Sequence, residues 1–141
     1  MKRIVIDTAV LVAGLRSRNG ASNALLELVA DRSLVPLATQ PLFLEYEDVL
    51  KRPDQRLAHG LAIEELDRVL AALASAVEPV EVHFQWRPQV RDPGDEMVLE
   101  AAINGRADAL VTYNVADFTA AAERFAVPVL RPADLLRKVR R

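Results

Sequence analysis

Short runs of consecutive apolar residues alternate along the chain with longer segments of helical character. The first run, residues 4–6, contains only isoleucine and valine, which is typical of a strand buried on both faces of a parallel sheet. Further strands of this kind are predicted at residues 34–38, 109–112 and 127–130, and a short or edge strand at residues 78–82. Pro36 weakens the second of them, because proline cannot donate to a strand ladder. This pattern predicts a central parallel sheet of about five strands.

Amphipathic helices are predicted in the intervals between these strands. The clearest spans residues 63–77, where apolar residues recur at every third or fourth position. Other helices are expected at residues 22–30, 41–50, 95–104 and 132–136. Ser22 and Pro41 are expected to begin the first two of these, and Gly105 to end the third. Strands that alternate with helices predict a three-layer α/β/α fold, in which helices cover both faces of the sheet.

The length of 141 residues predicts a single domain, residues 1–141, built around one core. No apolar stretch approaches the roughly 18 residues that a membrane-spanning helix needs, so no membrane partner is expected. The apolar run at residues 4–6 is also much shorter than the apolar region of a signal peptide. We therefore expect a cytoplasmic protein.

The sequence has no cysteine and only two histidines, His59 and His83, both expected as polar loop residues. Disulfides, thiol nucleophiles and the common structural zinc sites are therefore excluded. Any metal site must use oxygen ligands, which suit Mg²⁺, Mn²⁺ or Ca²⁺. The net charge of −2 does not show the excess of positive charge that is typical of nucleic-acid-binding proteins. The basic residues within 131–141 form either a solvated helix end or a phosphate contact.

Polar side chains directly follow two of the predicted strands. Asp7 and Thr8 come after the first strand. Thr112 ends the third main strand, and Asn114 and Asp117 follow it. Because the carboxyl ends of parallel strands meet at one edge of a sheet, where ligands bind, we expect these side chains at the same edge.

Two predicted helices contribute further acids. Asp95 lies in the first turn of its helix, whose start at the same edge brings the carboxylate toward the strand ends. Glu45 and Glu47 flank the apolar stripe of another helix, each about 100° from its centre. Helix geometry alone does not choose between these two glutamates.

Carboxylates that converge repel one another, so a cluster of them needs a shared cation. A divalent ion also lowers the pKa of water and stabilises the charge of a reacting phosphate, as phosphodiester hydrolysis requires. Each acid also has a purely structural explanation as a turn residue, a helix cap or a solvated helix acid. Some residues are expected outside the site: Asp92, Glu96 and Asp108 as surface or turn residues, and Phe84 and Trp86 as local packing.

Four segments in order resemble those of PIN-domain proteins, in particular the VapC-like toxins of bacterial toxin–antitoxin systems. Residues 4–11 resemble the opening strand and Asp-Thr-Asn-Val-Leu motif, and residues 45–50 resemble a Glu-Tyr-x-x-Val-Leu helix, which favours Glu45 over Glu47. Residues 91–95 resemble the segment whose final aspartate enters the site. Residues 110–118 resemble a Val-Thr-x-Asn-x-x-Asp-Phe element.

The resemblance covers essentially the whole chain and implies an endoribonuclease that depends on Mg²⁺ or Mn²⁺. Its implied metal-binding acids are Asp7, Glu45, Asp95 and Asp117, and its implied supporting residues are Thr8, Thr112 and Asn114. It further implies an RNA substrate, a cognate antitoxin protein as partner and a homodimer.

Ala9 departs from the family pattern, which has asparagine at that position. The amide of an asparagine at this position can orient a neighbouring carboxylate, and alanine lacks it. This difference supports an alternative function, that of a catalytically impaired PIN-like domain that binds a protein or RNA. A phosphatase with an aspartyl nucleophile is a further rival. It needs a second aspartate where Ala9 stands.

Overall fold

The computed structural model describes residues 2–85, 87 and 89–139. Within this part of the chain, a sheet of five parallel strands has the order β3-β2-β1-β4-β5. The strands are β1 (Arg3–Ile6), β2 (Val35–Ala38), β3 (Glu78–Pro79), β4 (Ala109–Val111) and β5 (Val129–Leu130). The predicted parallel sheet is confirmed, and β3 lies at its edge as expected. The strand order reverses at β1, between its neighbours β2 and β4.

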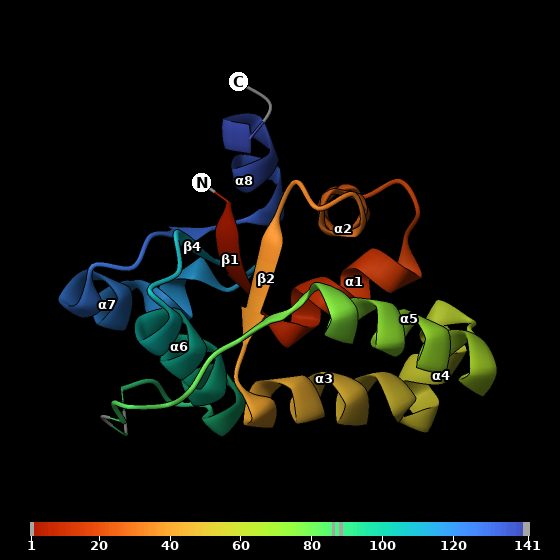
Figure 1. Cartoon of the computed structure of the whole chain (residues 1–141), viewed down its shortest axis with the longest axis horizontal. Coiled ribbons are helices and arrows are strands. Elements are labelled where there is room, and N and C mark those ends of the chain that lie inside the picture. Colours follow the sequence, from red (N-terminus) through yellow and green to blue (C-terminus); the bar gives the residue numbers. More distant parts are fainter. Residues whose placement is uncertain (1, 86, 88, 140–141) are drawn as a thin grey trace.

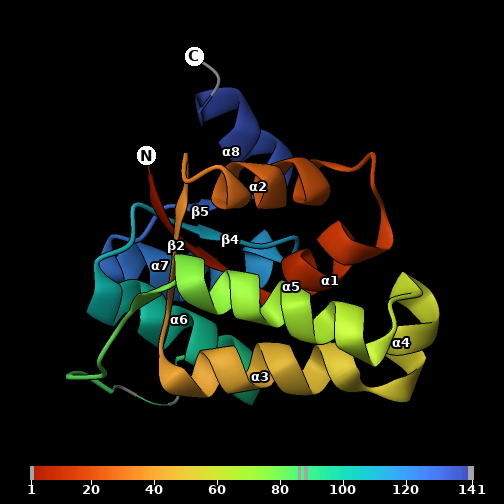
Figure 2. The same ribbon diagram turned by 45° about the vertical axis from the view of Figure 1, so that its right-hand side comes forward.

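Helices cover both faces of the sheet, which confirms the three-layer α/β/α fold (Figure 1). They are α1 (Thr8–Arg16), α2 (Ala21–Ala30), α3 (Gln40–Lys51), α4 (Pro53–His59), α5 (Ile63–Ala76), α6 (Pro93–Gly105), α7 (Val115–Phe125) and α8 (Pro132–Val139). The pair α6 and α7 covers one face, and α1, α2 and α8 lie on the other. Because α3 packs against α1, α4 and α5 and also reaches α6, it crosses the carboxyl edge of the sheet (Figure 2).

The core lies between the sheet and these helices. Ile4 and Val5 of β1 and Leu110 of β4 are fully buried. On one face they meet helix residues such as Phe118, and on the other residues such as Leu25, both also fully buried. Burial of the central strands on both faces explains their continuously apolar sequences. None of the helices in the described residues combines the length and apolarity that a membrane crossing requires.

Three helices were not predicted from periodicity. Helix α1 follows β1 at once, and it lacks a polar stripe because most of its residues from Val10 to Gly14 are buried. Helix α7 begins at Val115, two residues before Asp117. The third is α4. Helix α3 does end before Pro53, as expected, but Pro53 then occupies the first position of α4, where the absence of a proline N–H costs nothing.

Two expected helix ends are wrong in detail. Gly20, not Ser22, is the N-cap of α2; Ser22 lies inside the helix, buried, and its hydroxyl hydrogen-bonds the hydroxyl of Tyr113. Gly105 is the last residue of α6, and the left-handed residue after it is Arg106, with φ of 51°. Close packing explains the glycine at position 105, because a Cβ there would lie only 2.9 Å from Cγ2 of Val80.

Candidate functional site

Asp7 joins the central strand β1 to helix α1. Its backbone N–H donates to the carbonyl of Val111 at 2.9 Å, which continues the ladder between β1 and β4. Its own carbonyl accepts from the N–H of Val10 at 2.9 Å and so begins α1. The side chain therefore lies at the carboxyl edge of the sheet where the strand order reverses, and it is only 6% exposed.

Short hydrogen bonds hold the Asp7 carboxylate in place. Thr112 Oγ1, fully buried at the end of β4, donates to Asp7 Oδ2 at 2.7 Å. The backbone N–H of Asn114 in turn donates to Thr112 Oγ1 at 3.0 Å. Burial raises the pKa of Asp7, while the hydrogen bonds from Thr112 and from the N–H groups of Thr8 and Ala9 oppose that rise. The result is a buried, oriented carboxylate.

The start of α6 brings two more acids to the same place. Asp92 is the N-cap of this helix and accepts a hydrogen bond from the N–H of Gly94 at 2.7 Å. Asp95 follows in the first turn. Burial first, and then the negative charges of neighbouring acids, raise the pKa of Asp95 to about 6. Those acids are, in order of effect, Asp7, Asp92, Asp117 and Glu96. Like charges from three separate segments therefore converge on Asp95.

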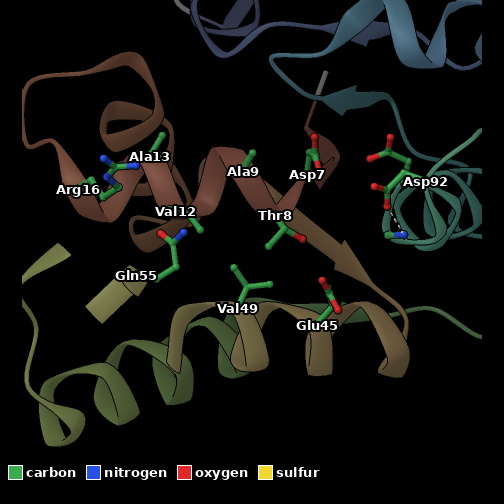
Figure 3. Close-up of a pocket in the computed structure, with 12 residues that line it drawn as sticks. Asp7, Thr8, Ala9, Val12, Ala13, Arg16, Glu45, Val49, Gln55 and Asp92 are labelled. Atoms are coloured by element: carbon green, nitrogen blue, oxygen red, sulfur yellow. Dashed lines mark hydrogen bonds between the residues drawn. The ribbon is translucent and has the colours of Figure 1, made fainter. Parts of the chain in front are cut away.

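A pocket of about 400 Å³ opens beside these acids, between α1, α3, α4 and the start of α6 (Figure 3). Asp7, Glu45, Asp92 and Asp95 all line it. Glu45 extends from α3 toward Thr8 and Asp7 on the opposite wall. Glu47 lies elsewhere on the same helix, with its carboxylate 3.6 Å from Lys51 Nζ. The tertiary structure therefore brings Glu45, and not Glu47, to the pocket.

These side chains fit a hard divalent cation by their chemistry. The donors are carboxylate oxygens, which Mg²⁺ and Mn²⁺ prefer, and repulsion from neighbouring acids adds to burial in raising the pKa of Asp95. Among the described residues, no three His, Asp or Glu side chains are grouped closely enough in this conformation to hold one ion. Side-chain rotation toward a cation would be needed to complete such a site.

The sequence profile of the PIN domain family matches residues 3–116. The chain belongs to the PIN domain family. PIN domains are in general nucleases that use divalent metal ions, so a general nuclease role follows from membership. The match contains Asp7, Glu45 and Asp95 and ends one residue before Asp117. No curated protein matches the sequence.

This PIN domain brings most of the predicted site residues together. Asp7, Thr8, Glu45 and Asp95 line one pocket. The supporting residues Thr112 and Asn114 form the hydrogen-bonded chain behind Asp7. Asp117, in the first turn of α7, does not line the pocket, although its charge contributes to the raised pKa of Asp95. It therefore lies at the margin of the acidic cluster.

Two acids were expected as surface or turn residues, and only one of them is. Asp92 is exposed and caps the turn at the start of α6, as predicted, and it also lines the pocket of this PIN domain. The signal was present, because the sequence Asp92-Pro93-Gly94-Asp95 places both acids in one helix start. Glu96 is buried and accepts hydrogen bonds from the backbone N–H groups of Gln89 and Val90, so it is no surface residue.

The remaining singled-out residues lie away from the acids. His59 is buried at the end of α4, where Nε2 lies 3.0 Å from the carbonyl of Leu50, so the prediction of a polar loop residue is wrong. His83 is exposed, and Asp108 accepts from the N–H groups of Lys2 and Arg3. Residues outside the described part of the chain include Trp86, Arg140 and Arg141.

Proposed function

We propose that this PIN domain is a metal-dependent endoribonuclease and the toxin component of a toxin–antitoxin pair. The observation that carries the proposal is the convergence of three carboxylates on one pocket, from Asp7 after β1, Glu45 on α3 and Asp95 at the start of α6. The pKa of Asp95 is raised to about 6, first by burial and then by repulsion from its acidic neighbours. Such repulsion is tolerated where a cation compensates it. The toxin role, the RNA substrate, the antitoxin partner and the homodimer are supported by the resemblance to VapC-like proteins.

In this proposal Asp7, Glu45, Asp95 and Asp117 hold Mg²⁺ or Mn²⁺. The bound ion supplies positive charge for the phosphate and lowers the pKa of water. Thr112 keeps one oxygen of Asp7 occupied through its hydrogen bond at 2.7 Å, and Asn114 keeps the Thr112 hydroxyl oriented. Thr8 borders the pocket directly after Asp7. A single-stranded RNA or loop suits this open pocket, because its backbone can bend toward the acids.

The test is cleavage of a panel of single-stranded and hairpin RNAs in Mg²⁺ or Mn²⁺, with and without chelator. We expect cleavage that the chelator abolishes and that Asp7→Asn reduces at least 100-fold. An Asp67→Asn variant, which alters an exposed acid on α5, is the matched control and should cleave like wild type. Equal rates for Asp7→Asn and wild type would refute the assignment.

A second candidate is a PIN-like domain that binds RNA or protein without cutting. The observation that favours it is Ala9, which lines the pocket with a methyl group where the family pattern has an amide. Under this reading, calorimetry detects Mn²⁺ binding to the wild-type protein while no RNA of the panel is cleaved. Cleavage that is sensitive to chelator would exclude it.

A further inference from the structure

The pocket continues well beyond the acids, along the exposed side of α1. Val12 of α1 faces Val49 of α3 across it (Figure 3), and with Ala9 and Ala13, which also line the pocket, they form an apolar wall. Arg16 lies on the same side of α1, about 12 Å along the helix from Thr8 at 1.5 Å per residue. The far end of the pocket therefore differs in chemistry from the acidic end.

Arg16 supplies an available cation at this far end. Its side chain is exposed, and it forms no ion pair or hydrogen bond with any of the residues that the structure describes. Several other arginines are held in ion pairs, as Arg52 is with Asp48 at 2.8 Å. Side chains on a helix lean toward its N-terminus, which for Arg16 is the acidic end of the pocket. A free guanidinium of this kind suits a phosphate group.

Gln55 supplies an unused hydrogen-bonding group between Arg16 and the acids. It extends from α4 toward Val12 (Figure 3), and its Oε1 atom is buried without any hydrogen-bond partner among the described residues. Buried polar atoms in folded proteins normally have a partner, so an unpaired one within a pocket is a position where a ligand or an ordered water can bond. The carboxamide presents both an acceptor and donors, which is what the edge of a nucleobase requires.

We infer that this part of the pocket is a subsite for the nucleotide next to the cleaved bond. In it, Arg16 binds a neighbouring phosphate and the Gln55 carboxamide hydrogen-bonds the edge of the base. The base lies against the apolar wall, and the methyl group of Ala9 leaves room for it where a larger polar side chain would intrude. This subsite rests on the proposed nuclease function, since the acidic end is where the bond would be cut.

The test measures binding of labelled single-stranded RNA pentanucleotides, A5, C5 and U5, by fluorescence anisotropy over a range of salt concentrations. Using Asp7→Asn protein without added metal keeps the RNA intact. We expect Arg16→Gln to weaken binding at least fivefold and to reduce the slope of log K against log salt by about 0.7, the value for one phosphate contact on a single strand. Arg18→Gln, which removes a nearby exposed cation outside the pocket, should change binding less than twofold.

Gln55 is tested by base preference. Gln55→Leu should change the ratios of affinity among A5, C5 and U5 at least threefold while leaving the salt slope unchanged. Its melting temperature should not fall, because the carboxamide oxygen has no partner to lose. An unchanged melting temperature therefore distinguishes loss of base recognition from unfolding.

Equal weakening by Arg16→Gln and Arg18→Gln would overturn the subsite, since general charge would then explain binding. Displacement of RNA by an acidic peptide, together with unchanged base ratios in Gln55→Leu, would also overturn it in favour of a protein ligand. RNA binding that depends on Arg16 in a protein that cuts no RNA would support the subsite and refute the nuclease proposal. Chelator-sensitive cleavage with no difference between the two arginine variants would refute the subsite alone.

Discussion

Asp7 is the residue on which the local geometry of the site depends. It directly follows the central strand, is the N-cap of α1 and accepts a hydrogen bond from Thr112, which directly follows the neighbouring strand. A buried carboxylate is stable only when donors compensate its desolvation. Thr112 and the N–H groups at the start of α1 do this only in part, because burial still raises the pKa of Asp7. These donors carry no positive charge, which leaves the negative charge of Asp7 available to a cation.

Removal of the Thr112 hydroxyl should destabilise the fold. In Thr112→Val, Asp7 Oδ2 loses its donor and the N–H of Asn114 loses its acceptor. We expect the free energy of unfolding, measured with urea, to fall by about 1–3 kcal/mol, the usual cost of leaving buried polar groups unpaired. Thr119→Val is the matched control: that hydroxyl is exposed and bonds only its own helix, so a change within about 0.5 kcal/mol is expected. Equal losses would contradict the role given to Thr112.

The raised pKa of Asp95 predicts a pH dependence of stability in the metal-free protein. An unfolded aspartate titrates near 3.9, whereas Asp95 in the folded chain titrates at about 6. Between these values the folded state binds more protons than the unfolded state, so stability falls as pH rises from about 4 to about 6. The raised pKa of Asp7 acts in the same direction. Urea titrations in chelator should show this fall in wild type and a smaller one in Asp95→Asn. The prediction would be contradicted if the free energy of unfolding of wild type rose between these pH values. An equal fall in wild type and in Asp95→Asn would also contradict it.

Among the elements, α3 decides which glutamate reaches the pocket. It crosses the carboxyl edge of the sheet, where it packs against α1 and α6 on one side and α5 on another. Glu45 lines the pocket together with Asp7 (Figure 3), whereas Glu47 lies beside Lys51, which also contacts Asp67 of α5. The two positions therefore form a natural pair of variants on one helix.

Under the proposed function, Glu45→Gln should lower the rate of RNA cleavage more than about tenfold, which corresponds to a lost interaction of about 1.4 kcal/mol. Glu47→Gln should keep the wild-type rate, because its partner Lys51 also lies 3.2 Å from Asp67 and retains that ion pair. The measurement is initial cleavage rate at saturating Mn²⁺. A larger loss in Glu47→Gln than in Glu45→Gln would exclude Glu45 from the metal-binding set.

At the scale of the whole molecule, only the folded chain brings Asp7, Glu45 and Asp95 to one pocket, with Asp117 of α7 at its margin. A ligand that binds the folded state alone stabilises it by mass action. Mn²⁺ should therefore raise the melting temperature of wild type by an amount that grows with ion concentration, at about 3 °C per kcal/mol for a chain of this size. Asp7→Asn should show little or no rise. The same shift in both proteins would place the bound ion elsewhere.

Much of the fold and part of the site were predictable because the signals are local. Strands buried on both faces require consecutive apolar residues, and Ile4–Ile6 and Ala109–Val111 have them. Residues that directly follow such strands must lie at the carboxyl edge, which places Asp7 and Thr112 without further information. The helices that were not predicted differ in their local signal. Helix α1 is apolar at nearly every position, so its buried side does not stand out as a period. Helix α7 buries Phe118, Ala121 and Ala122 at three- and four-residue spacing, which is a local signal that the prediction did not use.

The sequence by itself determined the parallel sheet, the edge at which the polar residues gather and the oxygen-only chemistry open to a chain without cysteine. Only the tertiary structure decided that Glu45 rather than Glu47 faces Asp7, that Asp92 joins the pocket wall and that Asp117 stays at its margin. The physical reason is that strand and helix periods depend on neighbours a few residues away. The side of a helix that meets a given pocket depends instead on how distant elements pack.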